Sequence, residues 1–137
     1  MPSLSSTAQW WLLSSLGLIL GCSSAPELET WPVKGAVVDQ TGASLTSGVV
    51  RFFASDEMHQ PDPHLITAGP IQTDGSFSVK THRRGFTYDG AVAGEYRLIV
   101  ITDKKTPAGE RVPVQFELPE PTTVERRENT LAIKIRR

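Results

Sequence analysis

The stretch Gly94-Glu95-Tyr96-Arg97-Leu98-Ile99-Val100-Ile101-Thr102 decides the fold class of this chain. Its side chains alternate with a period of two, so Tyr96, Leu98 and Val100 share one face of an extended strand. Ile99 and Ile101 make the opposite face apolar as well. A strand that is apolar on both faces is typical of a sheet interior that is covered on both sides. The stretch therefore predicts a central β-strand.

From residue 33 onward the chain has a similar hydrophobic pattern, in which short apolar runs are separated by turn residues. No window shows a sustained apolar stripe at the 3.6-residue period of a helix. The Asp74-Gly75 pair between two extended runs is a strong hairpin signal. Pro113 makes its own run an edge strand or an extended packed segment. Strands are expected at 33–38, 49–54, 65–71, 76–81, 94–102 and 112–118, with a last hairpin of 122–126 and 131–135.

The segments between these runs are polar and are expected to be loops, at 55–65, 82–93 and 103–111. About seven strands at this spacing are typical of a sandwich of two sheets. The expected fold class is therefore all-β, a seven-stranded antiparallel Greek-key sandwich.

Several short motifs resemble those of one known family. Val33-x-Gly35-x-Val37 and Gly48-x-Val50-x-Phe52 are followed by Thr73-Asp74-Gly75-Ser76-Phe77 and by Gly94-Glu95-Tyr96. In this order they resemble the carboxypeptidase regulatory-like, transthyretin-like domain of small bacterial lipoproteins, over roughly residues 33–135. The resemblance implies a transthyretin-like sandwich. These motifs concern turn geometry and core packing and do not indicate a reaction.

The N-terminal region carries a different signal, an uncharged run from Trp10 to Cys22 that the chain's one cysteine closes. Its apolar part, Trp10 to Leu20, is shorter than the ~20 residues of a membrane-spanning helix. It has the length of a secretory signal core, ~7–15 residues. Ile19-Leu20-Gly21-Cys22 resembles a bacterial lipobox. The resemblance implies cleavage before Cys22, a diacylglycerol thioether on its sulfur and an acyl chain on its new amine. The alternative is a core helix with a buried thiol.

The expected organisation is a lipoprotein signal peptide over 1–21, a tether over 22–32 and a β-sandwich domain over 33–137. The tether is polar and carries Pro26, Glu27, Glu29 and Pro32. With Cys22 lipidated the chain has no cysteine for a disulfide, so the domain depends on apolar burial. The net charge of −1 lacks the basic excess of a nucleic-acid-binding protein, and no nucleic-acid partner is expected.

The segment 82–93 holds the residues expected to contact a partner, namely His82, Arg83, Arg84, Phe86 and Tyr88. Arginines suit bidentate anions, and aromatic side chains can stack on a sugar ring or anchor a protein. Binding residues tend to lie on loops. The alternatives are a solvated charge run and an aromatic side chain that covers the open end of the core.

Other candidate chemistry is weaker. His59, Asp62 and His64 could hold a divalent metal, but a third imidazole or thiolate is not predicted nearby, so no metal is expected. Asp74 could be a catalytic acid, although its place in a tight turn explains it. Neither a Gly-x-Ser-x-Gly motif nor a glycine-rich phosphate loop occurs.

The function expected from these patterns is a non-catalytic, lipid-anchored envelope protein without a cofactor. Its lipid on Cys22 would hold it to the cell membrane or outer membrane, facing the periplasm or the outside, where it contacts protein or glycan. A carbohydrate-binding module is the alternative. A transthyretin-like hydrolase is disfavoured because the chain ends Ala132-Ile133-Lys134-Ile135-Arg136-Arg137, whereas such enzymes end in a Tyr-Arg-Gly-Ser tail.

Overall fold

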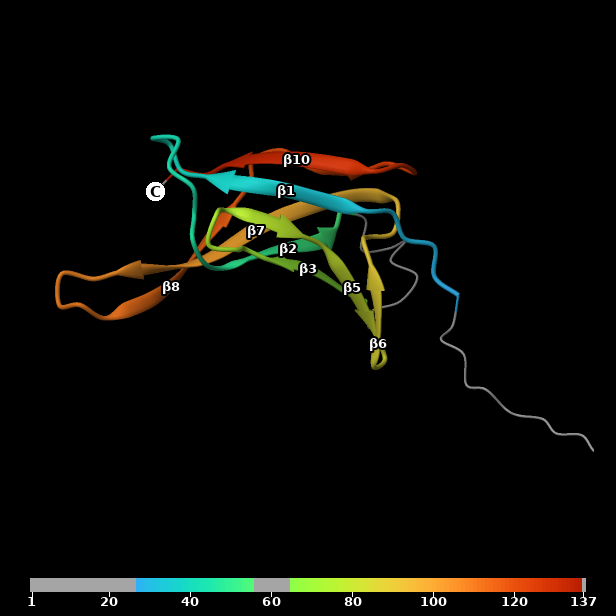
Figure 1. The fold of residues 1–137 in the computed structure, drawn as a ribbon, viewed down its shortest axis with the longest axis horizontal. Helices are drawn as coiled ribbons and strands as arrows, with labels where there is room; N and C mark the ends of the chain where they lie inside the picture. Colours follow the sequence, from blue (N-terminus) through green and yellow to red (C-terminus); the bar gives the residue numbers. More distant parts are fainter. Residues whose placement is uncertain (1–26, 56–64, 137) are drawn as a thin grey trace, which may run out of the picture.

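A computed structural model describes residues 27–55 and 65–136, and in these ranges the chain is all-β (Figure 1). Cys22, the apolar run before it, and His59, Asp62 and His64 lie outside the described residues. No helix in the described part is long and apolar enough to cross a bilayer. The strands are β1 (Val33–Val38), β2 (Val49–Ala54), β3 (Ile66–Pro70), β4 (Ser76–Ser78), β5 (Lys80–Arg83), β6 (Phe86–Asp89), β7 (Gly94–Lys105), β8 (Arg111–Glu117), β9 (Thr122–Val124) and β10 (Asn129–Lys134).

The strands form two sheets. A seven-stranded sheet has the order β6-β5-β3-β2-β7-β8, with β9 paired to the start of β7, and a three-stranded sheet has the order β10-β1-β4. The described pairs are antiparallel except β1–β10, which is parallel and aligns Val33 with Asn129 and Val38 with Lys134. In Figure 1 the strands β1 and β10 lie above the seven-stranded sheet.

The core lies between the two sheets and is built around the inner face of β7. Leu98 and Val100 are 1% and 0% exposed, opposite Phe52 and Val50 of β2. Phe77 of β4 and Ile133 of β10 close the core from the smaller sheet, and both are buried. Burying apolar surface at ~25 cal/mol per Å² is the main stabilising term, as expected for a domain without disulfides.

The outer face of β7 differs from the sequence-based expectation. Ile99 and Ile101 are half-buried, whereas the inner face is buried, so the strand is not covered equally on both sides. These isoleucines lie beside Arg51 and Val49 of β2, and Ile66 of β3 belongs to the same outer face with 52% exposure. The outer face of the seven-stranded sheet is therefore partly apolar and partly exposed.

Two expected pairings are wrong. The run 76–81 is divided, because β4 pairs with β1 in one sheet and β5 with β3 in the other. The Asp74-Gly75 turn forms, and its two arms are joined by the bridge Ile71–Phe77 and by a hydrogen bond from the N–H of Gln72 to the carbonyl of Ser76, without a longer ladder. The last hairpin does not form, since β9 pairs with β7 and β10 with β1. Each segment instead completes a sheet with a partner distant in sequence.

Two expected loops also contain strands. The segment 82–93 holds the end of β5 and all of β6, which form a hairpin. The segment 103–111 holds the last three residues of β7 and the first of β8, and 106–110 form the turn between them. The edge position expected for Pro113 is confirmed, because β8 ends the order of its sheet and Pro113 faces Asp103 of β7.

Candidate functional site

The residues expected to contact a partner lie on the β5–β6 hairpin. Its last pair is Arg83–Phe86, so the connection consists of Arg84 and Gly85 alone. Both have positive φ, 48° and 86°. Two positive values are what a type I′ hairpin turn requires, and glycine adopts such a value at no steric cost. The turn therefore fixes the backbone of Arg84 at the tip, where its side chain is exposed.

The hairpin divides the five expected residues between two faces. His82 is opposite Thr87 on the outer face of the sheet, where the imidazole Nδ1 lies 3.0 Å from the Thr87 hydroxyl. Tyr88 is opposite the buried Thr81 on the inner face, and Phe86, paired with Arg83, shares that face. Phe86 and Tyr88 are half-buried, so they do not form an exposed aromatic platform. The expected cluster is thus a cationic tip with two aromatic side chains behind it.

The base of the hairpin is held by buried hydrogen bonds. The Thr81 hydroxyl donates to the carbonyl of Gly90 at 2.7 Å and lies 3.1 Å from the hydroxyl of Thr67 on β3. On the outer face, Lys80 and Asp89 form an exposed ion pair at 3.9 Å. Thr67 and Thr81 were not among the predicted site residues, although threonines with aromatic residues nearby are a strand signal.

The hairpin base is also where the tether joins the domain. The backbone N–H of Trp31 donates to the carbonyl of Ala91 at 2.8 Å, and the N–H of Ala91 donates to the carbonyl of Trp31 at 3.0 Å. The hydroxyl of Thr30 donates to the carbonyl of Asp89 at 2.7 Å. Trp31 is half-buried and packs against the core. The end of the expected tether is therefore fixed to the strand that carries the candidate site.

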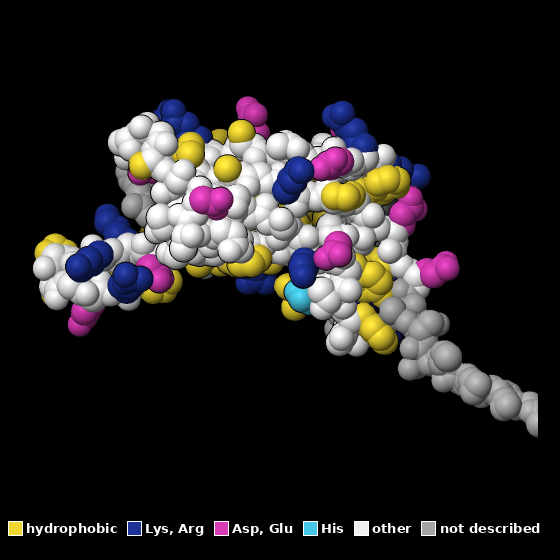
Figure 2. All heavy atoms as spheres, in the orientation of Figure 1, with side chains coloured by type: hydrophobic (Ala, Val, Ile, Leu, Met, Phe, Trp, Pro, Cys, Tyr) yellow, Lys and Arg dark blue, Asp and Glu magenta, His cyan; other side chains and the backbone are white. Residues whose placement is uncertain are grey.

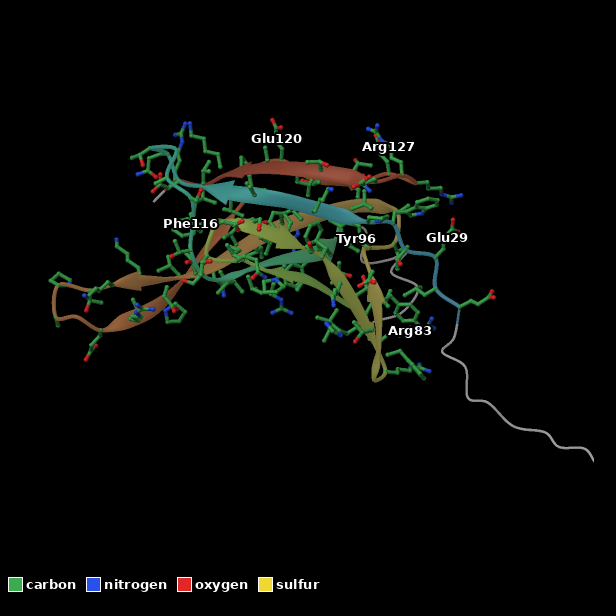
Figure 3. The ribbon with its side chains drawn as sticks, in the orientation of Figure 1. Glu29, Arg83, Tyr96, Phe116, Glu120 and Arg127 are labelled. Atoms are coloured by element: carbon green, nitrogen blue, oxygen red, sulfur yellow. The ribbon has the colours of Figure 1, made fainter. Side chains whose placement is uncertain are left out.

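A second surface lies on the open side of the sandwich, between β8 and β10. Its hollows, of about 500 Å³ and 290 Å³, share Leu118, Pro119 and Lys134 in their walls. Phe116 and Leu118 are partly buried against the core here (Figure 3). No ligand chemistry follows from this lining.

The described residues include no group of three or more histidine, cysteine, aspartate or glutamate side chains that could hold a metal ion. Among described side chains, burial raises the pKa of Tyr96, whose hydroxyl donates to the carbonyl of Val92 at 2.6 Å. Lys34 and Glu128 form an exposed ion pair at 2.9 Å, which raises the pKa of the lysine and lowers that of the glutamate.

Asp74, weighed as a catalytic acid, has a role in its turn. Its carboxylate accepts hydrogen bonds from the hydroxyl of Ser76 at 2.6 Å and from the N–H of Ser76 at 3.0 Å. These bonds, the hydroxyl first, lower the pKa of Asp74. A lowered pKa in the folded state contributes stability above the unfolded value of ~3.9, which is lost as the pH falls through the folded value.

Asp74→Asn should therefore flatten the acid side of the stability profile. The free energy of unfolding, measured in urea at successive pH values, should differ most from wild type above about pH 5, and the difference should disappear as the pH falls through the lowered pKa of Asp74. Ser76→Ala keeps the carboxylate but removes its main donor, and should give an intermediate acid dependence. An unchanged acid limb in Asp74→Asn would contradict this role.

Comparison with known proteins adds little to this geometry. No family model and no curated protein matches the chain. A solved structure, a 9R-lipoxygenase from Cyanothece PCC8801, is similar over 85% of this chain, with 14% sequence identity and a TM-score of 0.39. This chain spans 18% of that lipoxygenase chain, and a likeness at this level carries no argument for fold or chemistry.

Proposed function

We propose that this protein is a non-catalytic, lipid-anchored module of a bacterial cell envelope. The observation that carries the proposal is the uncharged apolar run that ends in Ile19-Leu20-Gly21-Cys22, only five residues before the described domain begins at Glu27. The apolar leader has the length of a secretory signal core, and the small residue followed by cysteine resembles a lipobox. The domain would be a Greek-key sandwich of the transthyretin-like, carboxypeptidase regulatory-like class.

The physical basis of the anchor is the burial of fatty chains in the bilayer. Each buried methylene contributes about 0.8 kcal/mol, and stable anchoring takes two chains or two signals. A diacylglycerol thioether on Cys22 supplies two chains, and acylation of the amine adds a third. The β-sandwich then stands close to the membrane and contacts an envelope component through the β5–β6 hairpin.

Replacing Cys22 should release the protein from the membrane. In a bacterial host, the full chain should sediment with the membrane fraction, and its intact mass should lack residues 1–21 and include the lipid. Cys22→Ser should be neither lipidated nor cut at this site. Because Trp10 to Leu20 is too short for a stable span, the variant should be extracted from membranes by alkaline carbonate, whereas wild type should resist extraction.

A matched control is Ser24→Ala, which alters the same tether without removing the thiol and should behave as wild type. An intact mass that retains residues 1–21 with a free thiol would contradict the proposal. So would carbonate-resistant membrane attachment of Cys22→Ser.

A further inference from the structure

The starting point is where the chain enters the domain. The hydrogen bonds of Thr30 to Asp89 and of Trp31 to Ala91 fix the end of the tether beside the base of the β5–β6 hairpin. Figure 1 shows the described chain beginning at the end of the molecule toward which this hairpin extends, while the β7–β8 hairpin projects from the opposite end. Arg83 and Glu29 also lie at this end (Figure 3).

The reach of the tether limits how far the domain stands from an anchor on Cys22. Four residues lie between Cys22 and Glu27, so five steps of no more than ~3.6 Å each span at most roughly 18 Å. The β5 and β6 strands have four residues each, so the hairpin itself extends about 13 Å at ~3.3 Å per residue. The two lengths are similar, so the hairpin tip can reach the surface to which the tether leads.

The charge of the hairpin suits an anionic surface. From Lys80 to Tyr88 the chain carries three cations and no acid. Lys80 pairs with Asp89 at the base, whereas Arg83 and Arg84 lie at the tip. Acids also lie at this end, namely Glu27 and Glu29 on the tether, Glu95 at the start of β7, and Glu125 and Glu128 between β9 and β10. The two-residue connection at the hairpin tip and the pair that flanks it carry no acid. The cationic part nearest to a membrane is therefore the Arg83-Arg84 tip.

We propose that Arg83 and Arg84 bind the phosphate headgroups of an anionic lipid surface, so that the β5–β6 tip is a second membrane contact that orients the domain. This inference rests on the proposed lipid anchor, which supplies the first contact. A basic side chain close to an anionic membrane raises the bound population about fivefold. Two arginines are too few to recruit the domain alone, but they can orient a domain that is already tethered.

Trypsin cleavage tests the orientation, because both hairpin tips carry cleavage sites. The chain 22–137 retains all ten described strands, and its lone Cys22 can be coupled to a maleimide lipid in vesicles. Chemical coupling makes this test independent of whether cells lipidate Cys22. Lys104 and Lys105 lie at the end of β7 that leads into the opposite hairpin tip, and they provide the internal control. Lys and Arg side chains are exposed at that end of the molecule (Figure 2).

On vesicles of phosphatidylcholine and phosphatidylglycerol, cleavage after Arg83 and Arg84 should be several-fold slower than on phosphatidylcholine alone. Cleavage after Lys104 and Lys105 should proceed at the same rate on both, and high salt should abolish the difference. Equal rates at the β5–β6 tip on the two membranes would overturn the proposal. Equal slowing at both tips, or full shielding on the neutral vesicles, would also overturn it.

Arg84→Asn removes one charge and leaves Arg83 as a cleavage site. Asparagine tolerates the left-handed φ of 48° at this position, so the turn should be retained, as a thermal melt can verify. The variant should lose most of the protection of the Arg83 bond on anionic vesicles. Arg84→Lys keeps the charge and should retain the protection. Full protection in Arg84→Asn would contradict binding through these arginines.

Discussion

Gly90→Ala should lower the free energy of unfolding by about 3 kcal/mol or more, because it adds an atom where two backbone segments meet. A Cβ on Gly90 would lie 2.1 Å from the carbonyl oxygen of Trp31. Gly90 also has a φ of +95°, which costs an L-residue about 1–2 kcal/mol. Relief of the clash would displace Trp31 and weaken both of its hydrogen bonds to Ala91.

Gly42→Ala is the matched control for this substitution. Gly42 has a similar φ of +88°, but a Cβ there would meet nothing within 4 Å. It should cost only the backbone term, about 1 kcal/mol. Urea unfolding of the chain 22–137 measures both, since Trp31 is its one tryptophan and reports the affected site. Equal losses in the two variants would show that the Trp31 backbone does not pack against Gly90 as the structure has it.

Local patterns in the sequence predicted the parts of the fold that depend on local chemistry. The strand bounds of β1 and β2 follow the apolar runs at 33–38 and 49–54. The Asp74-Gly75 turn forms where the residue types require it, with Gly75 at a φ of +87°. The alternation in β7 identified its buried face, with Tyr96, Leu98 and Val100 all inward.

Pairing partners could not be predicted in the same way, because they depend on contacts between distant segments. Apolar and polar side chains alternate without a break along the run 76–81, yet the chain passes from one sheet to the other at Val79. The N–H of Val79 donates a hydrogen bond to the carbonyl of Val33. The run 131–135 joins β1 in parallel, about a hundred residues away, rather than its sequence neighbour. A period of two indicates which face is buried and leaves open which strand lies alongside.

The candidate residues were expected on a loop, whereas the structure places them on a hairpin of two strands. The segment from His82 to Tyr88 was predicted to be a polar loop because it begins with an imidazole and two guanidinium side chains. The sequence did contain a signal for a hairpin. Arg84-Gly85 is a turn dipeptide, and Thr81 and Thr87 on either side of it are residues that favour strands. A hairpin places His82 and Tyr88 on opposite faces, whereas a flexible loop could have brought them together.

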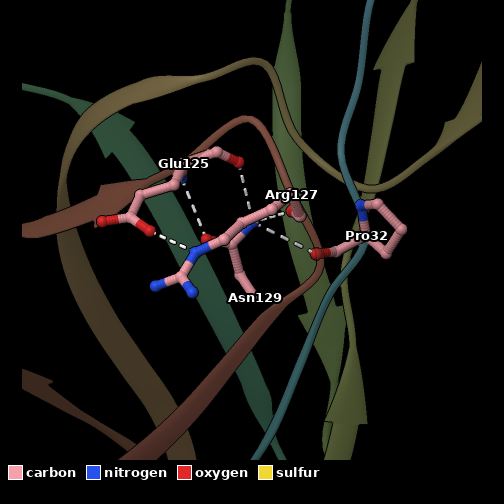
Figure 4. A network of polar contacts seen from close by, with 4 residues as sticks. All are labelled: Pro32, Glu125, Arg127 and Asn129. Atoms are coloured by element: carbon pink, nitrogen blue, oxygen red, sulfur yellow. Dashed lines mark hydrogen bonds and ion pairs between the residues drawn. The ribbon is translucent and has the colours of Figure 1, made fainter.

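Asn129 should be the most sensitive polar residue of the described core, because one side chain satisfies several backbone groups (Figure 4). Its carbonyl oxygen accepts from the N–H of Glu125 at 2.9 Å. Its amide nitrogen donates to the carbonyl oxygens of Arg127 at 2.7 Å, Glu125 at 3.0 Å and Pro32 at 3.3 Å. Asn129 is 7% exposed, so water cannot readily replace these bonds. It thereby holds together the β9–β10 connection and the segment that leads into β1.

Asn129→Ala should cost about 2–4 kcal/mol, because each buried polar group left without a partner costs about 1–3 kcal/mol. Asn129→Asp should cost more at neutral pH, since a carboxylate would face three carbonyl oxygens in place of an amide donor. Acidification should recover part of the lost stability as the carboxyl protonates.

Arg127→Ala is the control on the same connection. Its side chain is 73% exposed and pairs with Glu125 at the surface, so its loss should stay within about 0.5 kcal/mol. Urea unfolding curves for the three variants provide the measurement. A loss for Asn129→Ala no greater than that for Arg127→Ala would mean that the Asn129 bonds contribute no more than an exposed ion pair.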